Sequence, residues 1–175
     1  SPTIASEGTL GREDGVSIAK INASSSFNAG VIAHELGHNF GLYHANLLLE
    51  CNLEIQQILN RPKKYTYACN SKEYGDFYDD MGSAIPYHFN SYHKEKLGWM
   101  PSENIQIVEA PGVYEIFPIE KESKAIQVLK IPSHHPLVKD WETSLEYRTQ
   151  YSEGDIREDP RIVLHIPLFF GKDHG

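Results

Sequence analysis

The chain has 175 residues, a formal net charge of −8 and a sequence pI near 5.5. An acidic chain repels nucleic-acid phosphates, so the composition argues against a nucleic-acid-binding function and agrees with a secreted enzyme. No apolar run approaches the ~20 residues that a membrane-spanning helix needs.

The first part of the chain predicts a strand, a polar turn and a helix. Val16 to Ile21 alternates apolar and polar residues, which is typical of a strand. A polar turn follows, and one of Ser25, Ser26 or Asn28 is expected to cap a helix that runs to about Phe40. The residues expected on the buried side of this helix are Val31, Ile32, Leu36 and Phe40.

This helix carries the motif H-E-x-x-H-x-x-G-x-x-H, from His34 to His44. His34 and His38 are one helical turn apart, so their imidazoles share a face and can bind one divalent ion. Gly41 can take a positive φ, end the helix and turn the chain back, which lets His44 reach the same ion. Three histidines leave an open position, as in a catalytic zinc site.

Glu35 lies next to a ligand but is rotated by about 100° around the helix axis. It can therefore act on a metal-activated water without being a ligand. Zinc lowers the pKa of bound water and polarises a carbonyl, and Glu35 can serve as general base and then as general acid. The motif predicts hydrolysis of peptide bonds by a metal-activated water.

The next stretch predicts an inserted helix over Leu47 to Leu59, which ends at Arg61-Pro62. The chain has two cysteines, Cys51 and Cys69. They either form one disulfide, which would suit a secreted protein, or remain two thiols.

Three carboxylates, those of Asp76, Asp79 and Asp80, stand just before Met81. They either serve the metal centre, by bonding a ligand histidine or holding calcium, or cap the backbone of a turn. Asn90 to Leu97 predicts a short helix that is stopped by Gly98. His88 and His93 are expected in packing or surface roles, because three histidines already complete the protein side of the zinc site.

Beyond Pro101 the pattern changes to short strands separated by turns, which suggests a β-sandwich-like domain. In one of them Leu145, Tyr147 and Thr149 alternate with Glu146 and Arg148, as in a half-buried strand. The other expected strands are Ile105–Val108, Val113–Phe117, Ala125–Ile131 and Ile162–Ile166. His134, His135 and His165 show no metal-site spacing.

The extended motif with a downstream methionine at Met81 resembles the metzincin clan of zinc endopeptidases. The chain resembles the gametolysin family most, with the immune inhibitor A family a close second, in two segments: H-E-L-G-H-N-F-G-L-Y-H-A and, further along, Y-G-D-F-Y-D-D-M-G. The resemblance implies that Met81 forms the floor of the site and that Ala5 to Leu10 is a substrate-binding edge strand. It also implies secretion and extracellular protein substrates. Tyr87 is a weaker candidate for stabilising an oxyanion.

These observations predict an α+β chain. We expect the carboxyl-terminal part of a metzincin-like domain over residues 1–100, lacking its amino-terminal strands, and a truncated β-rich domain over residues 101–175. The cofactor is one zinc ion, and the partner is a protein or peptide substrate. The alternatives are a zinc-binding module without turnover and an adhesion module. Glu35 argues against the first, since zinc binding alone needs no carboxylate there. The oligomeric state is left open.

Overall fold

The structure is a computed structural model that describes residues 6–11, 15–22, 29–56, 64–82, 88–133, 142–149 and 161–165. The chain divides into two compact units, Ser1–Phe89 and Asn90–Gly175. The boundary between the two units lies between residues 89 and 90, whereas the sequence pattern changes to short strands only beyond Pro101. Among the described residues, no helix is long and apolar enough to cross a membrane.

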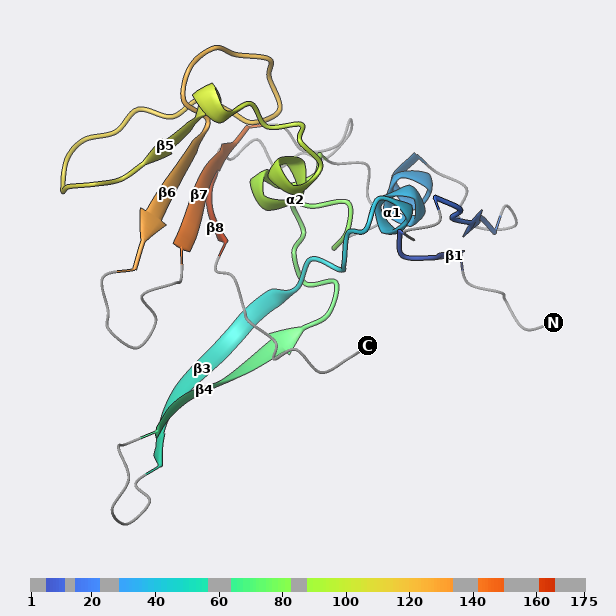
Figure 1. Cartoon of the computed structure of the whole chain (residues 1–175), viewed down its shortest axis with the longest axis horizontal. Helices are drawn as coiled ribbons and strands as arrows, with labels where there is room; N and C mark the ends of the chain where they lie inside the picture. The colour runs from blue at the N-terminus through green and yellow to red at the C-terminus, as the bar shows by residue number, and fades with distance from the viewer. Residues whose placement is uncertain are drawn as a thin grey trace. The chain divides into compact units, whose positions relative to one another are not determined.

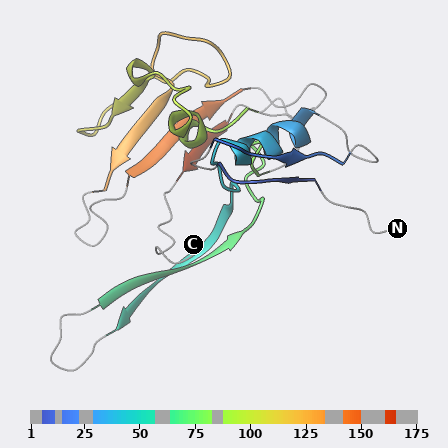
Figure 2. The same ribbon diagram turned by 45° about the vertical axis from the view of Figure 1, so that its right-hand side comes forward.

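The first unit begins with a pair of short strands. β1 (Glu7–Gly8) pairs antiparallel with β2 (Ala19–Lys20), and both lie within stretches expected to be extended. The pair runs alongside helix α1 (Ala29–Asn39), as Figure 2 shows. A Cβ on Gly8 would collide with the backbone oxygen of Glu35, so glycine is what lets β1 approach the helix so closely.

Helix α1 ends as the sequence predicts, at Gly41, whose φ is +84°. The Gly41 N–H donates to the carbonyl of His38 (2.8 Å) and the Leu42 N–H to the carbonyl of Gly37 (3.0 Å), which is a Schellman ending. Its capping candidates Ser25, Ser26 and Asn28 lie outside the described residues.

The predicted buried side of α1 is wrong for Leu36 and Phe40, which are 42% and 56% exposed. The helix instead buries Gly30, His34, Glu35 and Gly37. The reason is that α1 packs through its histidine side, where the small Gly37 admits the side chain of Met81.

The predicted helix over Leu47 to Leu59 is wrong within the described residues. β3 (Leu47–Gln56) and β4 (Lys64–Lys72) form an antiparallel hairpin, drawn as a long twisted ribbon in Figure 1. Apolar residues occupy every second position from 47 to 55, namely Leu47, Leu49, Cys51, Leu53 and Ile55. This spacing fits a strand as well as a helix, and β4 supplies the pairing partner. A bulge interrupts the ladder between Leu48 and Glu50.

The second unit opens with helix α2 (Ser91–Lys96), where the Asn90 side chain accepts from the His93 N–H at 2.9 Å. Gly98, with φ +71°, follows its end as predicted. A short 3₁₀ turn η1 (Ser102–Asn104) leads into one four-stranded sheet of order β5-β6-β7-β8. The strands are β5 (Ile105–Ile107), β6 (Val128–Pro132), β7 (Glu142–Arg148) and β8 (Arg161–His165).

β5 and β6 are parallel, whereas β6 pairs antiparallel with β7 and β7 with β8. The predicted strand over Val113 to Phe117 is wrong, because this stretch is an irregular part of the crossover between β5 and β6. Buried amides support that crossover: Asn104 donates to the carbonyls of Ser123 and Ala125. The apolar core of this unit contains Met100, Ile119 and Val128. The described residues give this single sheet, so the sandwich stays a prediction.

Strand β7 alternates between a more buried and a less buried face, as predicted, but the more buried face carries the polar residues. Ser144, Glu146 and Arg148 are buried, while Leu145 and Tyr147 are only partly covered. The charged residues are accommodated because they pair with one another, which makes the burial of charge tolerable.

Candidate metal centre

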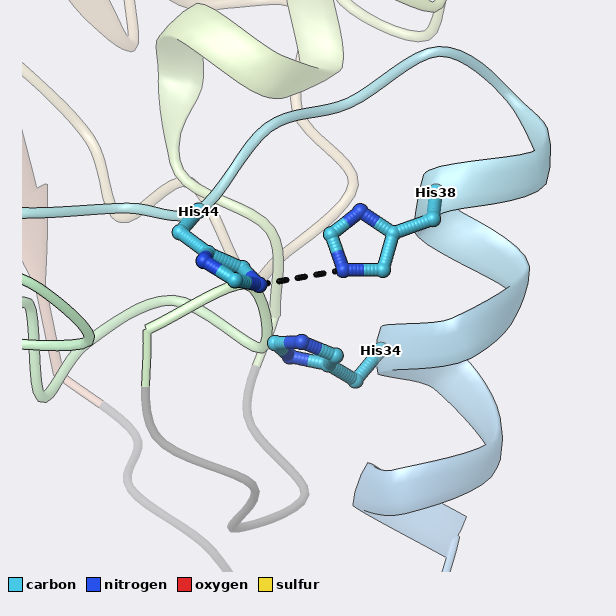
Figure 3. A group of neighbouring side chains, drawn as sticks. All are labelled: His34, His38 and His44. Carbon is cyan, nitrogen blue, oxygen red and sulfur yellow. Dashed lines mark hydrogen bonds between the residues drawn. The ribbon is translucent and has the colours of Figure 1, made fainter. Parts of the chain in front are cut away.

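Three histidine side chains converge at the end of α1 (Figure 3). His34 and His38 project from the same face of the helix, and His44 returns to them after the turn at Gly41. One ring nitrogen from each lies within 4.8 Å of those of the other two. In the described part of the chain, this is the only group of three or more histidine, cysteine or carboxylate side chains that could hold a metal ion.

The outer nitrogen of each ring faces an acceptor. His34 Nδ1 lies 2.6 Å from the carbonyl oxygen of Asp80, and His38 Nδ1 lies 2.9 Å from that of Leu42. His44 Nδ1 lies 2.7 Å from Oε1 of Glu73. Carbonyl and carboxylate oxygens only accept, so each Nδ1 carries the hydrogen and donates it. In a neutral ring, each Nε2 therefore presents a lone pair for a metal.

This donor set fits a zinc ion. His38 Nε2 and His44 Nε2 are 3.1 Å apart, and two lone pairs that close repel unless a cation or a proton lies between them. Tetrahedral zinc with bonds of about 2.0–2.1 Å would set the nitrogens about 3.3 Å apart. Burial lowers the pKa of His34, as do the charges of His38 and His44, against the hydrogen bond to Asp80. The lowered pKa favours the neutral ring that a metal needs.

Glu35 is 6% exposed and follows the first ligand directly. Its pKa is raised above the ordinary value, chiefly by burial, while the charges of His38 and His44 act in the opposite direction. A carboxylate with a raised pKa holds a proton more readily, which suits a group that must accept and return one. β1 lies directly against it, since a Cβ on Gly8 would come within 3.1 Å of Glu35 Oε2.

Met81 is fully buried and packs under the helix, where its Sδ occupies the space that a Cβ on Gly37 would need. Its carbonyl accepts from the Ala45 N–H at 3.0 Å, which ties this turn to the segment that carries His44. Its own N–H donates to Asp79 Oδ1 at 2.6 Å. Asp79 thus caps the turn, and Asp76 does so as well by accepting from the Tyr78 N–H. The backbone carbonyl of Asp80 contacts His34 of the cluster.

Two further residues lie at the site, Glu73 and Tyr74, and the sequence pattern does not indicate either of them. Both follow the end of β4, and the Tyr74 ring centroid lies 4.0 Å from that of His44 and 5.8 Å from that of His34. Burial raises the pKa of Tyr74, and the charges of Glu73 and Glu35 raise it further. No local motif marks either residue, because only the closed hairpin brings them to His44.

The other histidines considered from the sequence do not join the cluster. His88 and His93 are not part of it, and His165 belongs to β8 in the second unit. Tyr87, His134 and His135 lie outside the described residues.

The family model described as Metallo-peptidase family M12B Reprolysin-like matches residues 5–45. The matched stretch contains β1, β2, α1, the three histidines and Glu35, and it ends before the hairpin and Met81. Searches of curated proteins and of solved structures gave no match. The match and the histidine cluster together support, at a coarse level, a metzincin-like zinc metalloprotease whose substrates are proteins or peptides.

Proposed function

We propose that this chain carries the catalytic centre of a gametolysin-like zinc endopeptidase that cleaves extracellular proteins. The observation that carries the proposal is the set of three imidazoles with their Nδ1 atoms fixed by acceptors and their Nε2 atoms directed at one point. The buried carboxylate of Glu35 beside them supplies what a purely structural zinc site would not need.

Each residue of the site has a separate role in the proposed reaction. His34, His38 and His44 would hold the zinc ion, which when bound lowers the pKa of water and polarises the substrate carbonyl. Glu35 takes the proton that the attacking water loses and passes it to the leaving amine. Met81 supports the imidazoles from below. By resemblance, β1 offers a backbone edge to an extended substrate.

The remaining parts of the proposal rest on resemblance and on the cysteine pair. Secretion would agree with a disulfide between Cys51 and Cys69. Residues 1–100 would form the protease part, and residues 101–175 a β-rich domain of sandwich type.

The test compares Glu35→Gln and His38→Ala with the parent protein. Glu35→Gln should keep zinc, because the three ligands are untouched, and lose at least about 10²–10⁴-fold in the rate of cleavage of an unfolded protein. His38→Ala should lose both zinc and activity. Zinc stoichiometry is measured beside cleavage for all three proteins.

Two results would contradict the proposal. If Glu35→Gln cleaves as fast as the parent, the role of Glu35 is wrong. If the parent holds zinc and cleaves no protein substrate, the site belongs to a zinc-binding module without turnover.

A further inference from the structure

Tyr74 has an unusual backbone conformation for its residue type. Its φ is +57°, and it is the one non-glycine residue with a positive φ in the described part of the chain. Left-handed conformations are unfavourable for residues with a Cβ and are normally taken by glycine or asparagine. Such strain persists only where the surrounding structure enforces it, and it concentrates at functional sites.

The surroundings do enforce it. The Gly75 N–H donates to the carbonyl of Lys72 at 3.1 Å, closing a tight turn around Tyr74. A Cβ on Gly75 would lie 2.7 Å from the Lys72 oxygen, so position 75 has no room for a side chain. Tyr74 and Gly75 therefore cannot exchange places in this turn. The next residue, Asp76, donates its N–H to the carbonyl of Ala45 at 3.2 Å. On the other side of Tyr74, Lys72 pairs with Leu47 in the hairpin. The backbone on both sides of Tyr74 is therefore held next to the segment that carries His44.

This turn places a partly exposed aromatic ring beside two of the three histidines of the cluster. The ring planes of Tyr74 and His44 are inclined at 39°, with centroids 4.0 Å apart, and the His34 ring is 5.8 Å away. Tyr74 is 46% exposed, so core packing does not explain its position. The phenol carries a hydroxyl group, which can donate a hydrogen bond.

We propose that Tyr74 is a catalytic residue whose hydroxyl donates a hydrogen bond to the carbonyl oxygen of the scissile peptide. This inference rests on the proposed peptidase function. When water attacks the carbonyl carbon, the electron pair of the C=O bond moves to the oxygen, which becomes negative. The Tyr74 O–H stabilises that charge and keeps its proton throughout, while the proton lost by water goes to Glu35. A donor that is fixed before the reaction is effective because it needs no reorganisation.

The experiment uses Tyr74→Phe, which keeps the ring and removes the hydroxyl, and Tyr74→Asn, which removes the ring but tolerates the left-handed conformation. Tyr92→Phe, which removes the hydroxyl of an exposed tyrosine on α2, is the matched control. For each protein we would measure kcat and KM on a peptide substrate, zinc stoichiometry and the midpoint of thermal unfolding.

We expect Tyr74→Phe to lose at least about tenfold in kcat, towards the ~10²–10³-fold typical of one oxyanion donor, with KM, zinc content and unfolding midpoint unchanged. Tyr74→Asn should lose as much kcat and unfold at the parent's temperature or higher, because its turn is unstrained. The control should match the parent.

Full kcat in Tyr74→Phe would overturn the inference, and so would loss of zinc from that variant, which would make the residue structural. An unfolding midpoint of Tyr74→Asn well below that of the parent would show that the ring is kept for stability, which also contradicts it. A parent that binds zinc but never cleaves refutes the proposed function itself and is recognised before any variant is compared.

Discussion

Among the three clustered histidines, His44 differs in what holds its outer nitrogen. The rings of His34 and His38 donate to backbone carbonyls, whereas His44 donates to the carboxylate of Glu73. A carboxylate partner fixes the ring orientation and raises the basicity of the nitrogen that faces the metal. Unlike a backbone carbonyl, it can be removed by substitution, which makes its contribution measurable.

We predict that Glu73→Ala weakens zinc binding about 10–100-fold, as is typical when such a partner is lost. Glu73→Gln keeps an acceptor oxygen without the charge and should fall between Glu73→Ala and the parent. Competition with a zinc chelator measures the affinity, and Glu103→Ala, at an exposed carboxylate of the second unit, is the control. Equal affinity of Glu73→Ala and the parent would show that the contact does not support the metal.

The sequence predicts the histidines and Glu35 because they lie on one helix and the turn that ends it. Helical spacing and the conformational freedom of Gly41 are local properties that can be evaluated without the rest of the fold. Glu73 is 29 residues from His44 along the chain and reaches it only when the β3–β4 hairpin closes. The sequence pattern predicts a helix where β3 forms, and a helix there does not connect Glu73 or Tyr74 with the site.

At the scale of elements, the predictions that depend on neighbouring residues are correct, and those that depend on distant partners are wrong. Helix α2 was predicted because Asn90 caps it and Gly98 follows its end, both within a few residues. Strand β3 depends on a partner that begins at Lys64, and its apolar residues suit either conformation. The polar face of β7 is buried because charged partners meet there, and alternation alone does not reveal which face that is.

The hairpin register places Cys51 directly opposite Cys69. Residues opposite each other on antiparallel strands have Cα atoms about 4.5–5.5 Å apart, inside the range of about 4.4–6.8 Å that a disulfide spans. The backbone therefore permits the bridge predicted from the sequence. A two-stranded ribbon is marginally stable by itself, so a covalent link between its strands would matter.

We predict that the native protein resists alkylation of Cys51 and Cys69 until a reductant is added. A bridge of this loop length should contribute about 3 kcal/mol to stability by restricting the unfolded chain. The Cys51→Ala/Cys69→Ala double variant should therefore show faster amide exchange in β3 and β4, with exchange in the second unit unchanged as the internal control. Two freely alkylated thiols in the unreduced protein would rule the bridge out.

At the scale of the whole molecule, the two units are stabilised by different chemistry. In the first unit, Leu42, Ala45 and Met81 are buried next to the histidine cluster. The second has its own apolar core and buried ion pairs, in which Arg148 lies 2.9 Å from Glu120 and 3.1 Å from Glu146. Metal removal and acid should consequently act on the two units by separate routes.

Glu146 is the most informative of these buried charges. One oxygen accepts from the Ser91 N–H at 2.6 Å and lies 3.2 Å from His165 Nε2, while the other faces Arg148. Burial alone would raise its pKa. The hydrogen bond and charge of His165, the charge of Arg148 and the Ser91 N–H outweigh burial and lower the pKa to about 2. The carboxylate therefore stays ionised in the folded unit at a pH where the unfolded chain is protonated.

Below its unfolded pKa of 4.5, Glu146 binds more protons in the unfolded state than in the folded one. Its contribution to stability, on the order of 3 kcal/mol, is thus complete above pH 4.5 and is lost as the pH falls towards about 2. Both tryptophans, Trp99 and Trp141, belong to the second unit, so denaturant unfolding followed by their fluorescence reports on that unit even if acid releases metal from the first.

Glu146→Gln should be less stable than the parent at pH 7, because Arg148 loses a charged partner. Its stability should also decline less steeply between pH 4.5 and pH 2. Glu142→Gln, on the same strand but partly exposed, should keep the parent's decline, and an undiminished decline in Glu146→Gln would show that other carboxylates cause it.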